Sequence, residues 1–92
     1  MYFVYILQSQ KNQSYYIGST KNPEQRLVEH NNGKTKSLRS ILPMFLLFKQ
    51  GFETRVEAVR VEKKLKKWKN RELIERIIKE GVFKSTGPIV QR

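Results

Sequence analysis

The sequence predicts an α+β fold, in which a small three-stranded sheet, mixed or antiparallel, is flanked by helices in the order β-β-α-β-α-α. Three observations lead to this prediction. Six consecutive apolar residues from Tyr2 to Leu7 have the length and the aromatic and β-branched content of a buried strand. Asn22-Pro23-Glu24 has the features of a helix start. Thr54-Arg55-Val56-Glu57 has the spacing of a capping box at the start of another helix.

The first strand is predicted to begin a β-hairpin. Polar turn-forming residues follow it from Gln8 to Ser14, and Tyr15-Tyr16-Ile17 begins a second short strand. The hairpin therefore extends from Tyr2 to Thr20. Gly18 in the second strand permits a bend or the close approach of another backbone.

The middle of the chain is predicted to hold a helix, a loop and a strand. The helix that Asn22 caps should end near Gly33, a residue type suited to a left-handed cap. The polar and basic segment from Gly33 to Ser40 is interpreted as a mobile loop. Met44 to Phe48 is almost continuously apolar, which is typical of a strand in the interior of a sheet.

Two further helices are predicted after residue 54. In the first, apolar residues recur at three- and four-residue steps and form the stripe Ala58, Val61, Leu65 and Trp68. Asn70 can cap the second, which ends at Gly81. Its inward-facing residues are Leu73, Ile74, Ile77 and Ile78. We therefore expect one domain over residues 1–92, with its core within residues 2–81 and a loosely held tail over residues 82–92.

The charge balance predicts a polyanionic partner. Nineteen lysines and arginines stand against eight glutamates, which gives a net charge of +11 and a self-repulsion that costs stability. Nucleic acid is the first candidate for this partner. An anionic membrane surface comes after it, and we expect no membrane partner, because the apolar stripe around Trp68 is assigned to the core.

Composition excludes several kinds of site. The absence of cysteine excludes disulfide scaffolds, zinc ribbons and thiol nucleophiles, and the single histidine excludes a multi-histidine zinc site. The absence of aspartate argues against a metal site built from clustered aspartates. The first apolar run lacks a charged leader, and the longest one, Ile41 to Phe48, is far shorter than the ~20 residues that span a bilayer. We expect a cytoplasmic protein with no signal peptide and no membrane span.

One acid stands alone in a basic segment. Residues 60–71 contain seven lysines and arginines, and their only acid is Glu62. A helix surface this positive is suited to binding phosphates, although a solvated helix face is the simpler interpretation. Glu62 can form an ion pair with Lys66 one turn later, or it can be a carboxylate that holds a divalent cation.

Four other polar groups are candidates for chemistry. Tyr5 and Tyr16 lie in the two strands of the hairpin with ten residues between them, so their side chains can meet across the pair. Arg26 and His30 are four residues apart and share one face of a helix. The alternatives are that both tyrosines are core aromatics and that His30 is a surface residue.

These residues resemble the motifs of the GIY-YIG nuclease family. Phe3-Val4-Tyr5, ten intervening residues and Tyr16-Ile17-Gly18 resemble the paired signature of that family. Arg26 and His30 follow at the family's spacing, and Ala58-x-x-x-Glu62 resembles the segment that carries its metal-binding glutamate. The resemblance extends from about residue 2 to residue 68. Within the family, the chain resembles the small stand-alone members related to the N-terminal domain of the C component of excinuclease ABC.

The resemblance implies a divalent-metal-dependent endonuclease that hydrolyses phosphodiester bonds, in DNA more than in RNA, with a role in repair or recombination. It implies Tyr5 as the general base, Tyr16 and His30 as residues that position it or the water, and Arg26 as a phosphate ligand. It implies Glu62 as the single protein carboxylate on Mg²⁺ or Mn²⁺. The sequence departs from the pattern in three places. The first motif, Phe3-Val4-Tyr5, keeps only its tyrosine, Ser19 replaces a lysine of some relatives, and Ile74 replaces an asparagine, for which Asn70 is the nearest alternative.

The nucleic-acid-binding surface is expected to contain basic residues of the loop and of the later helix. These are Lys34, Lys36, Arg39, Arg60, Lys63, Lys64, Lys66, Lys67 and Lys69. Two other functions are open at this point. One is a nucleic-acid-binding module that keeps the fold without turnover, and the other is a partner-dependent subunit that docks through the apolar residues of the tail. The oligomeric state is open as well, with a monomer as the simplest case.

Overall fold

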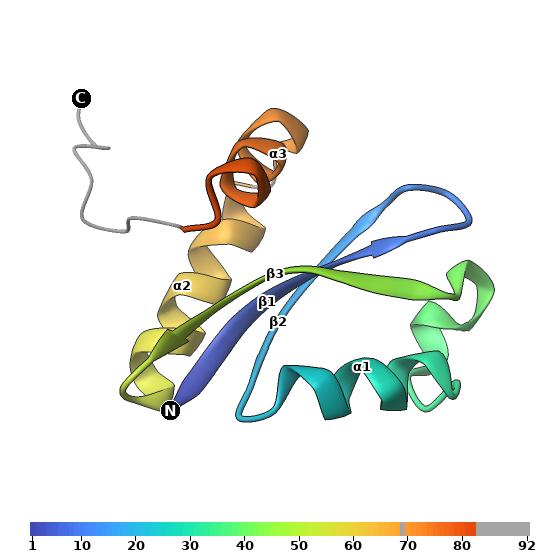
Figure 1. Cartoon of the computed structure of the whole chain (residues 1–92), viewed down its shortest axis with the longest axis horizontal. Coiled ribbons are helices and arrows are strands. Elements are labelled where there is room, and N and C mark those ends of the chain that lie inside the picture. Colours follow the sequence, from blue (N-terminus) through green and yellow to red (C-terminus); the bar gives the residue numbers. More distant parts are fainter. Residues whose placement is uncertain (69, 83–92) are drawn as a thin grey trace.

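The structure is a computed structural model, and it describes residues 1–68 and 70–82. It consists of β1 (Tyr2–Ser9), β2 (Tyr15–Thr20), α1 (Pro23–Asn31), the 3₁₀ helix η1 (Lys36–Ile41), β3 (Met44–Phe52), α2 (Arg55–Lys67) and α3 (Arg71–Glu80). The three strands form one antiparallel sheet in the order β2-β1-β3, with the helices on its two sides (Figure 1). The predicted α+β class and element order are confirmed.

The sheet separates two apolar clusters because side chains alternate along its strands. Val4, Ile6 and Ile17 face the buried residues of α2 and α3 and form the larger cluster with them. Tyr5 and Leu7 point to the opposite face, where they pack with Met44 and with residues of α1 and η1. The central strand β1 is therefore buried on both faces, as its apolar run predicts.

The predicted helix caps are present. The Asn22 side chain accepts a hydrogen bond from the backbone amide of Gln25, 3.1 Å away, and Pro23 occupies the first helical position of α1. Thr54 and Glu57 form the reciprocal contacts of a capping box. Asn70 caps α3, and Gly81 ends it in the left-handed conformation at φ +78°. These caps satisfy backbone groups that helix ends would otherwise leave without partners.

Three expectations about local structure are wrong. The segment interpreted as a mobile loop contains η1, which the buried side chain of Leu38 anchors. The strand from Met44 is an edge strand, not an interior one, and its Phe45 side chain is 50% exposed. Trp68 is 42% exposed, because α2 ends at Lys67 and its buried stripe ends at Leu65.

The residues expected in the tail lie outside the described part of the chain, apart from Val82, which is exposed. In the two ranges that are described, we find no helix with the length and apolar character that crossing a bilayer requires.

Candidate active site

Tyr5 lies at the centre of the candidate site. Its side chain is 1% exposed and projects from the central strand toward α1. The ring of Tyr16 on β2 lies on the same face, with its centroid 6.3 Å from that of Tyr5. Tyr16 also meets the His30 ring edge-on, at 5.2 Å between centroids. The two tyrosines therefore meet as the hairpin spacing predicts, and both contribute to the apolar cluster on this face.

His30 is brought to Tyr5 by α1. Its imidazole is 1% exposed, so the alternative of a surface histidine is wrong. Nε2 lies 3.3 Å from the Tyr5 hydroxyl, and Nδ1 lies 2.6 Å from the Thr35 hydroxyl. Thr35 was not among the predicted site residues, because no spacing rule links the residue before η1 to a histidine.

Arg26 completes the group around the Tyr5 hydroxyl. Its guanidinium interacts with that hydroxyl, and the interaction lowers the pKa of Tyr5 and raises that of Arg26; the guanidinium also pairs with Glu29 at 3.5 Å. Because a guanidinium only donates, the Tyr5 oxygen is on the acceptor side of this interaction, and the hydroxyl can donate its own proton to Nε2 of His30. In the tautomer that we assign to His30, Nδ1 carries the proton and donates to the Thr35 oxygen, and Nε2 is free to accept from Tyr5.

The electrostatics of the site favour a neutral pair. Burial raises the pKa of the Tyr5 phenol to about 12, with the neighbouring Tyr16 adding to the rise and Arg26 opposing it. Burial and the positive charge of Arg26 lower the pKa of His30 below its ordinary value of 6.5. At neutral pH Tyr5 therefore carries its proton, and the free nitrogen of His30 is available to accept it.

Glu62 lies on α2, against the edge strand β2. Its side chain is 17% exposed, and its two carboxylate oxygens have different partners. Oε1 accepts a hydrogen bond from the Ser19 hydroxyl at 2.6 Å, and Oε2 pairs with Lys66 at 2.7 Å. The negative charge of Glu62 also contributes to the raised pKa of Tyr5, so the two groups interact electrostatically.

The donor set around Glu62 fits one kind of metal ion. Over residues 1–68 and 70–82, histidine and acidic side chains do not gather in groups of three that could hold a metal on their own. Glu62 and Ser19 offer hard oxygen donors, and Mg²⁺ is commonly held by one or two carboxylates together with water and substrate phosphates. The site therefore fits Mg²⁺ or Mn²⁺ if a phosphate supplies further ligands and Lys66 gives up its pairing.

The predicted nucleic-acid-binding residues fall on two sides of the sheet. Lys34, Lys36 and Arg39 are exposed after α1 and in η1, whereas Arg60, Lys63, Lys64, Lys66 and Lys67 lie on α2 (Figure 1). Lys69 lies outside the described residues. Within the first group, Arg39 donates through Nε to the Gly33 carbonyl at 2.6 Å and thereby fastens η1 to the end of α1.

Comparison with known proteins places this site in a family. A family model described as the GIY-YIG catalytic domain matches residues 1–75. A UPF0213 protein from Streptococcus pneumoniae serotype 4 is 41% identical over 68 residues, which are 73% of this chain and 68% of that protein. A UPF0213 protein from Bacillus licheniformis is 39% identical over 85 residues, covering 88% of this chain and 87% of that one.

The fold is also shared with a solved structure. The solution NMR structure of a UPF0213 protein from Bacillus halodurans matches with a TM-score of 0.55 at 28% identity, over the whole of both chains. The family match covers every residue around Tyr5 and Glu62. On this sequence match, these relatives and this fold, the chain belongs to the GIY-YIG family.

Proposed function

We propose that the protein is a divalent-metal-dependent endonuclease that hydrolyses phosphodiester bonds in DNA, with RNA as the less favoured substrate. The observation that supports this most strongly is the convergence of Arg26 and His30 on the hydroxyl of Tyr5, in a chain of the GIY-YIG family. A cation that can bind phosphate, Arg26, and a group that can accept a proton, His30, both act on the Tyr5 oxygen. This arrangement is suited to phosphoryl transfer. A role in DNA repair or recombination, in the cytoplasm, belongs to the same proposal.

Arg26 is proposed to bind the phosphate. Its side chain is 49% exposed, so a substrate can reach it, and its planar fork matches two phosphate oxygens. When Arg26 turns from Tyr5 to a phosphate, it frees a lone pair on the Tyr5 oxygen. Binding of the substrate would thus activate the residue beside it.

Tyr5 is proposed to work as a relay and not as a preformed phenolate. With a pKa of about 12 the phenol is almost fully protonated at neutral pH. The water oxygen bonds to phosphorus while the bond to the 3′-oxygen breaks, and the water proton passes to the Tyr5 oxygen. Tyr5 hands its own proton to Nε2 of His30, which is neutral and 3.3 Å away. Tyr16 packs against both rings and holds them in place.

Glu62 is proposed to hold Mg²⁺ or Mn²⁺ together with a substrate phosphate. The ion supplies Lewis-acid polarisation of the phosphate and a counter-charge for the departing 3′-oxygen. Ser19 donates to one carboxylate oxygen and so fixes the orientation of Glu62, in the way that outer partners orient metal ligands.

A nucleic-acid-binding module without turnover is the second candidate. It is favoured by the engagement of both Glu62 oxygens within the protein and by the high pKa of Tyr5. The partner-dependent subunit depends on the apolar tail, of which only Val82 lies within the described ranges, so the structure adds no support for it. The narrower likeness to the N-terminal domain of the C component of excinuclease ABC stays a prediction.

Incubation with labelled single-stranded, duplex and branched DNA, and with RNA of the same sequences, separates the two candidates. The endonuclease predicts cleavage that requires Mg²⁺ or Mn²⁺ and disappears with chelator. Binding that weakens steeply with salt, with no cleavage of any substrate in either metal, would support the module instead.

A further inference from the structure

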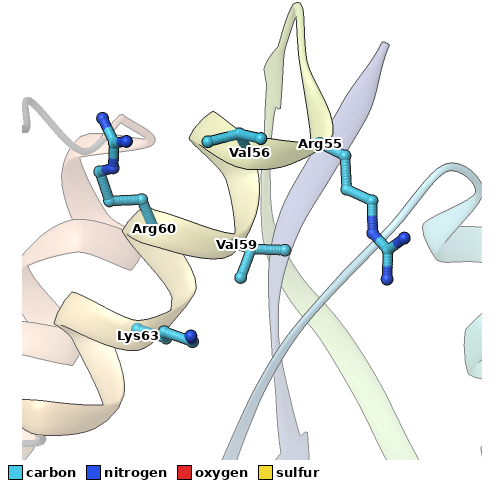
Figure 2. A pocket seen from close by; sticks show the side chains of 5 residues that line it. All are labelled: Arg55, Val56, Val59, Arg60 and Lys63. Atoms are coloured by element: carbon cyan, nitrogen blue, oxygen red, sulfur yellow. The ribbon is translucent and has the colours of Figure 1, made fainter.

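The outward face of α2 carries a groove. It is an open hollow of about 550 Å³, bordered by Arg55, Val56, Val59, Arg60 and Lys63 (Figure 2). Figure 2 shows the two valines between the cationic side chains, with Arg55 and Arg60 pointing to opposite sides of the helix. The hollow lies on the side of α2 away from the core residues Ala58, Val61 and Leu65.

The groove adjoins the candidate active site. Lys63 follows Glu62 directly, and Val59 lies one helical turn before it, on the neighbouring strip of the helix surface. The lining residues span eight steps of the helix, which is about 12 Å along its axis. The groove therefore begins beside Glu62 and continues along α2 toward Arg55.

The chemistry of the groove is both cationic and apolar. Three of its five lining residues are positively charged, and none of the five is acidic. Val56 is 64% exposed and does not belong to the buried face of α2, so its apolar side chain is available to a ligand. The lining thus suits a ligand with anionic groups on one side and apolar surface on another.

We propose that this groove binds an unpaired stretch of the nucleic-acid strand beside the cleaved phosphate, so the substrate is single-stranded there. The inference depends on the proposed function for its link to cleavage. Phosphates of the strand pair with Arg55, Arg60 and Lys63, and its bases lie against Val56 and Val59. A duplex keeps its base faces stacked inside, whereas a hollow of this volume, within the ~300–1,000 Å³ of small-ligand sites, admits single bases.

Site-directed photocrosslinking tests the placement. Because the natural chain has no cysteine, Val59→Cys provides a single attachment point for a thiol-reactive benzophenone. Val28→Cys is the control: Val28 is a valine two residues after Arg26, on the far side of α1, and it is more exposed (57%) than the partly buried Val59, so its label is the more accessible of the two. Each labelled protein is irradiated in chelator with a single-stranded DNA oligonucleotide and with its blunt duplex.

The inference predicts that Val59→Cys crosslinks the single strand several-fold more than the duplex, and several-fold more than Val28→Cys does. Equal crosslinking from the two positions, or stronger crosslinking to the duplex, overturns it. Crosslinks between two protein copies that oligonucleotide does not suppress also overturn it, because the groove would then be a protein interface.

Charge removal provides a second measurement. Arg55→Gln with Arg60→Gln removes two groove cations, whereas Arg76→Gln with Lys79→Gln removes two exposed cations from α3. For a single strand, the groove pair should reduce the slope of log affinity against log salt by about 1.4. The α3 pair should leave it nearly unchanged, and equal changes in both would contradict the inference.

The two proposals fail separately. Metal-dependent cleavage by the unmodified protein without selective crosslinking at Val59→Cys removes the groove inference and leaves the endonuclease. Selective crosslinking without cleavage in Mg²⁺ or Mn²⁺ removes the endonuclease and leaves the groove as a binding surface.

Discussion

Gly18 lies directly opposite Tyr5 in the β1–β2 pair, and the Tyr5 ring fills the space that a side chain at residue 18 would need. A Cβ built on Gly18 would stand 2.5 Å from the Tyr5 hydroxyl oxygen, far closer than van der Waals contact. The glycine that follows Tyr16-Ile17 is therefore required by the position of Tyr5. The contact gives a physical reason for the glycine of the Tyr16-Ile17-Gly18 motif.

Gly18→Ala should accordingly displace Tyr5 and reduce both stability and cleavage. Overpacking a buried site costs about 1–3 kcal/mol, and thermal unfolding should register it as a lower melting temperature. Gly51→Ala is the control, because its Cβ would meet mainly the flexible end of the exposed Met1 side chain, with the Phe3 ring next at 3.2 Å. If Gly18→Ala had the same melting temperature and cleavage rate as Gly51→Ala, the close contact between Gly18 and Tyr5 would not matter for stability or activity.

Tyr5→Phe should abolish the proton relay while keeping the ring in the core. The variant leaves Nε2 of His30 buried without its partner, which typically costs about 1–3 kcal/mol of unfolding free energy. We expect cleavage to fall far more than this modest destabilisation explains, with DNA binding unchanged in chelator. A collapse of the melting temperature with full activity in the remaining folded protein would make Tyr5 a core aromatic only.

Arg26→Ala should lower the cleavage rate by about 10²–10³, the usual effect of losing one well-placed donor to a transition state. Its side chain is about half exposed, so the melting temperature should hardly change. Single-turnover cleavage measures the rate, and Glu29→Gln is the control because it removes the ion-pair partner of Arg26 and keeps Arg26 itself. Equal losses in both variants would show that the ion pair matters, not a contact to phosphate.

The pH dependence of stability should reveal the buried His30. Its folded-state pKa is lowered from 6.5, so the unfolded chain binds the proton more readily. The free energy of unfolding should therefore fall as pH drops below about 6.5, and this contribution should be fully present above it. Urea unfolding between about pH 5 and 7, of the wild type and of His30→Gln, isolates the effect.

The same property can be read directly by NMR. His30 is the only histidine in the chain, so a single set of imidazole signals reports its titration. A midpoint at or above 6.5 would contradict the burial of the ring and its proximity to Arg26.

Much of the fold follows from local signals in the sequence. The caps at Asn22, Thr54 and Asn70 depend on residues within one helical turn, and the run from Tyr2 to Leu7 shows a strand buried on both faces. The place of β3 at the edge does not follow, because an apolar run reads the same in an edge and a central strand. Only pairing between distant segments decides it.

The candidate site divides in the same way. Tyr5, Arg26 and His30 could be named because they sit at regular spacings within one hairpin and one helix. Thr35 and Ser19 contact His30 and Glu62 through the tertiary fold, and no local spacing marks them. Arg55 was not predicted to bind nucleic acid, because in the sequence it belongs to a capping box and lies outside the basic segment of residues 60–71. Figure 2 shows its side chain at the groove.

The proposed mechanism depends most on Glu62 as the metal ligand. Substitutions of Glu62 and of its ion-pair partner Lys66 test this role together. Glu62→Gln keeps the size of the side chain and removes the charge that would hold the metal, whereas Lys66→Gln breaks the ion pair and releases Oε2 of a carboxylate that stays charged and bound to Ser19. The measurement is cleavage of labelled DNA over a Mg²⁺ titration by wild type and both variants. We predict no cleavage by Glu62→Gln at any Mg²⁺ concentration, and cleavage by Lys66→Gln at lower Mg²⁺ than wild type needs. Cleavage by Glu62→Gln at the wild-type rate and Mg²⁺ dependence would contradict the metal assignment and the mechanism that depends on it.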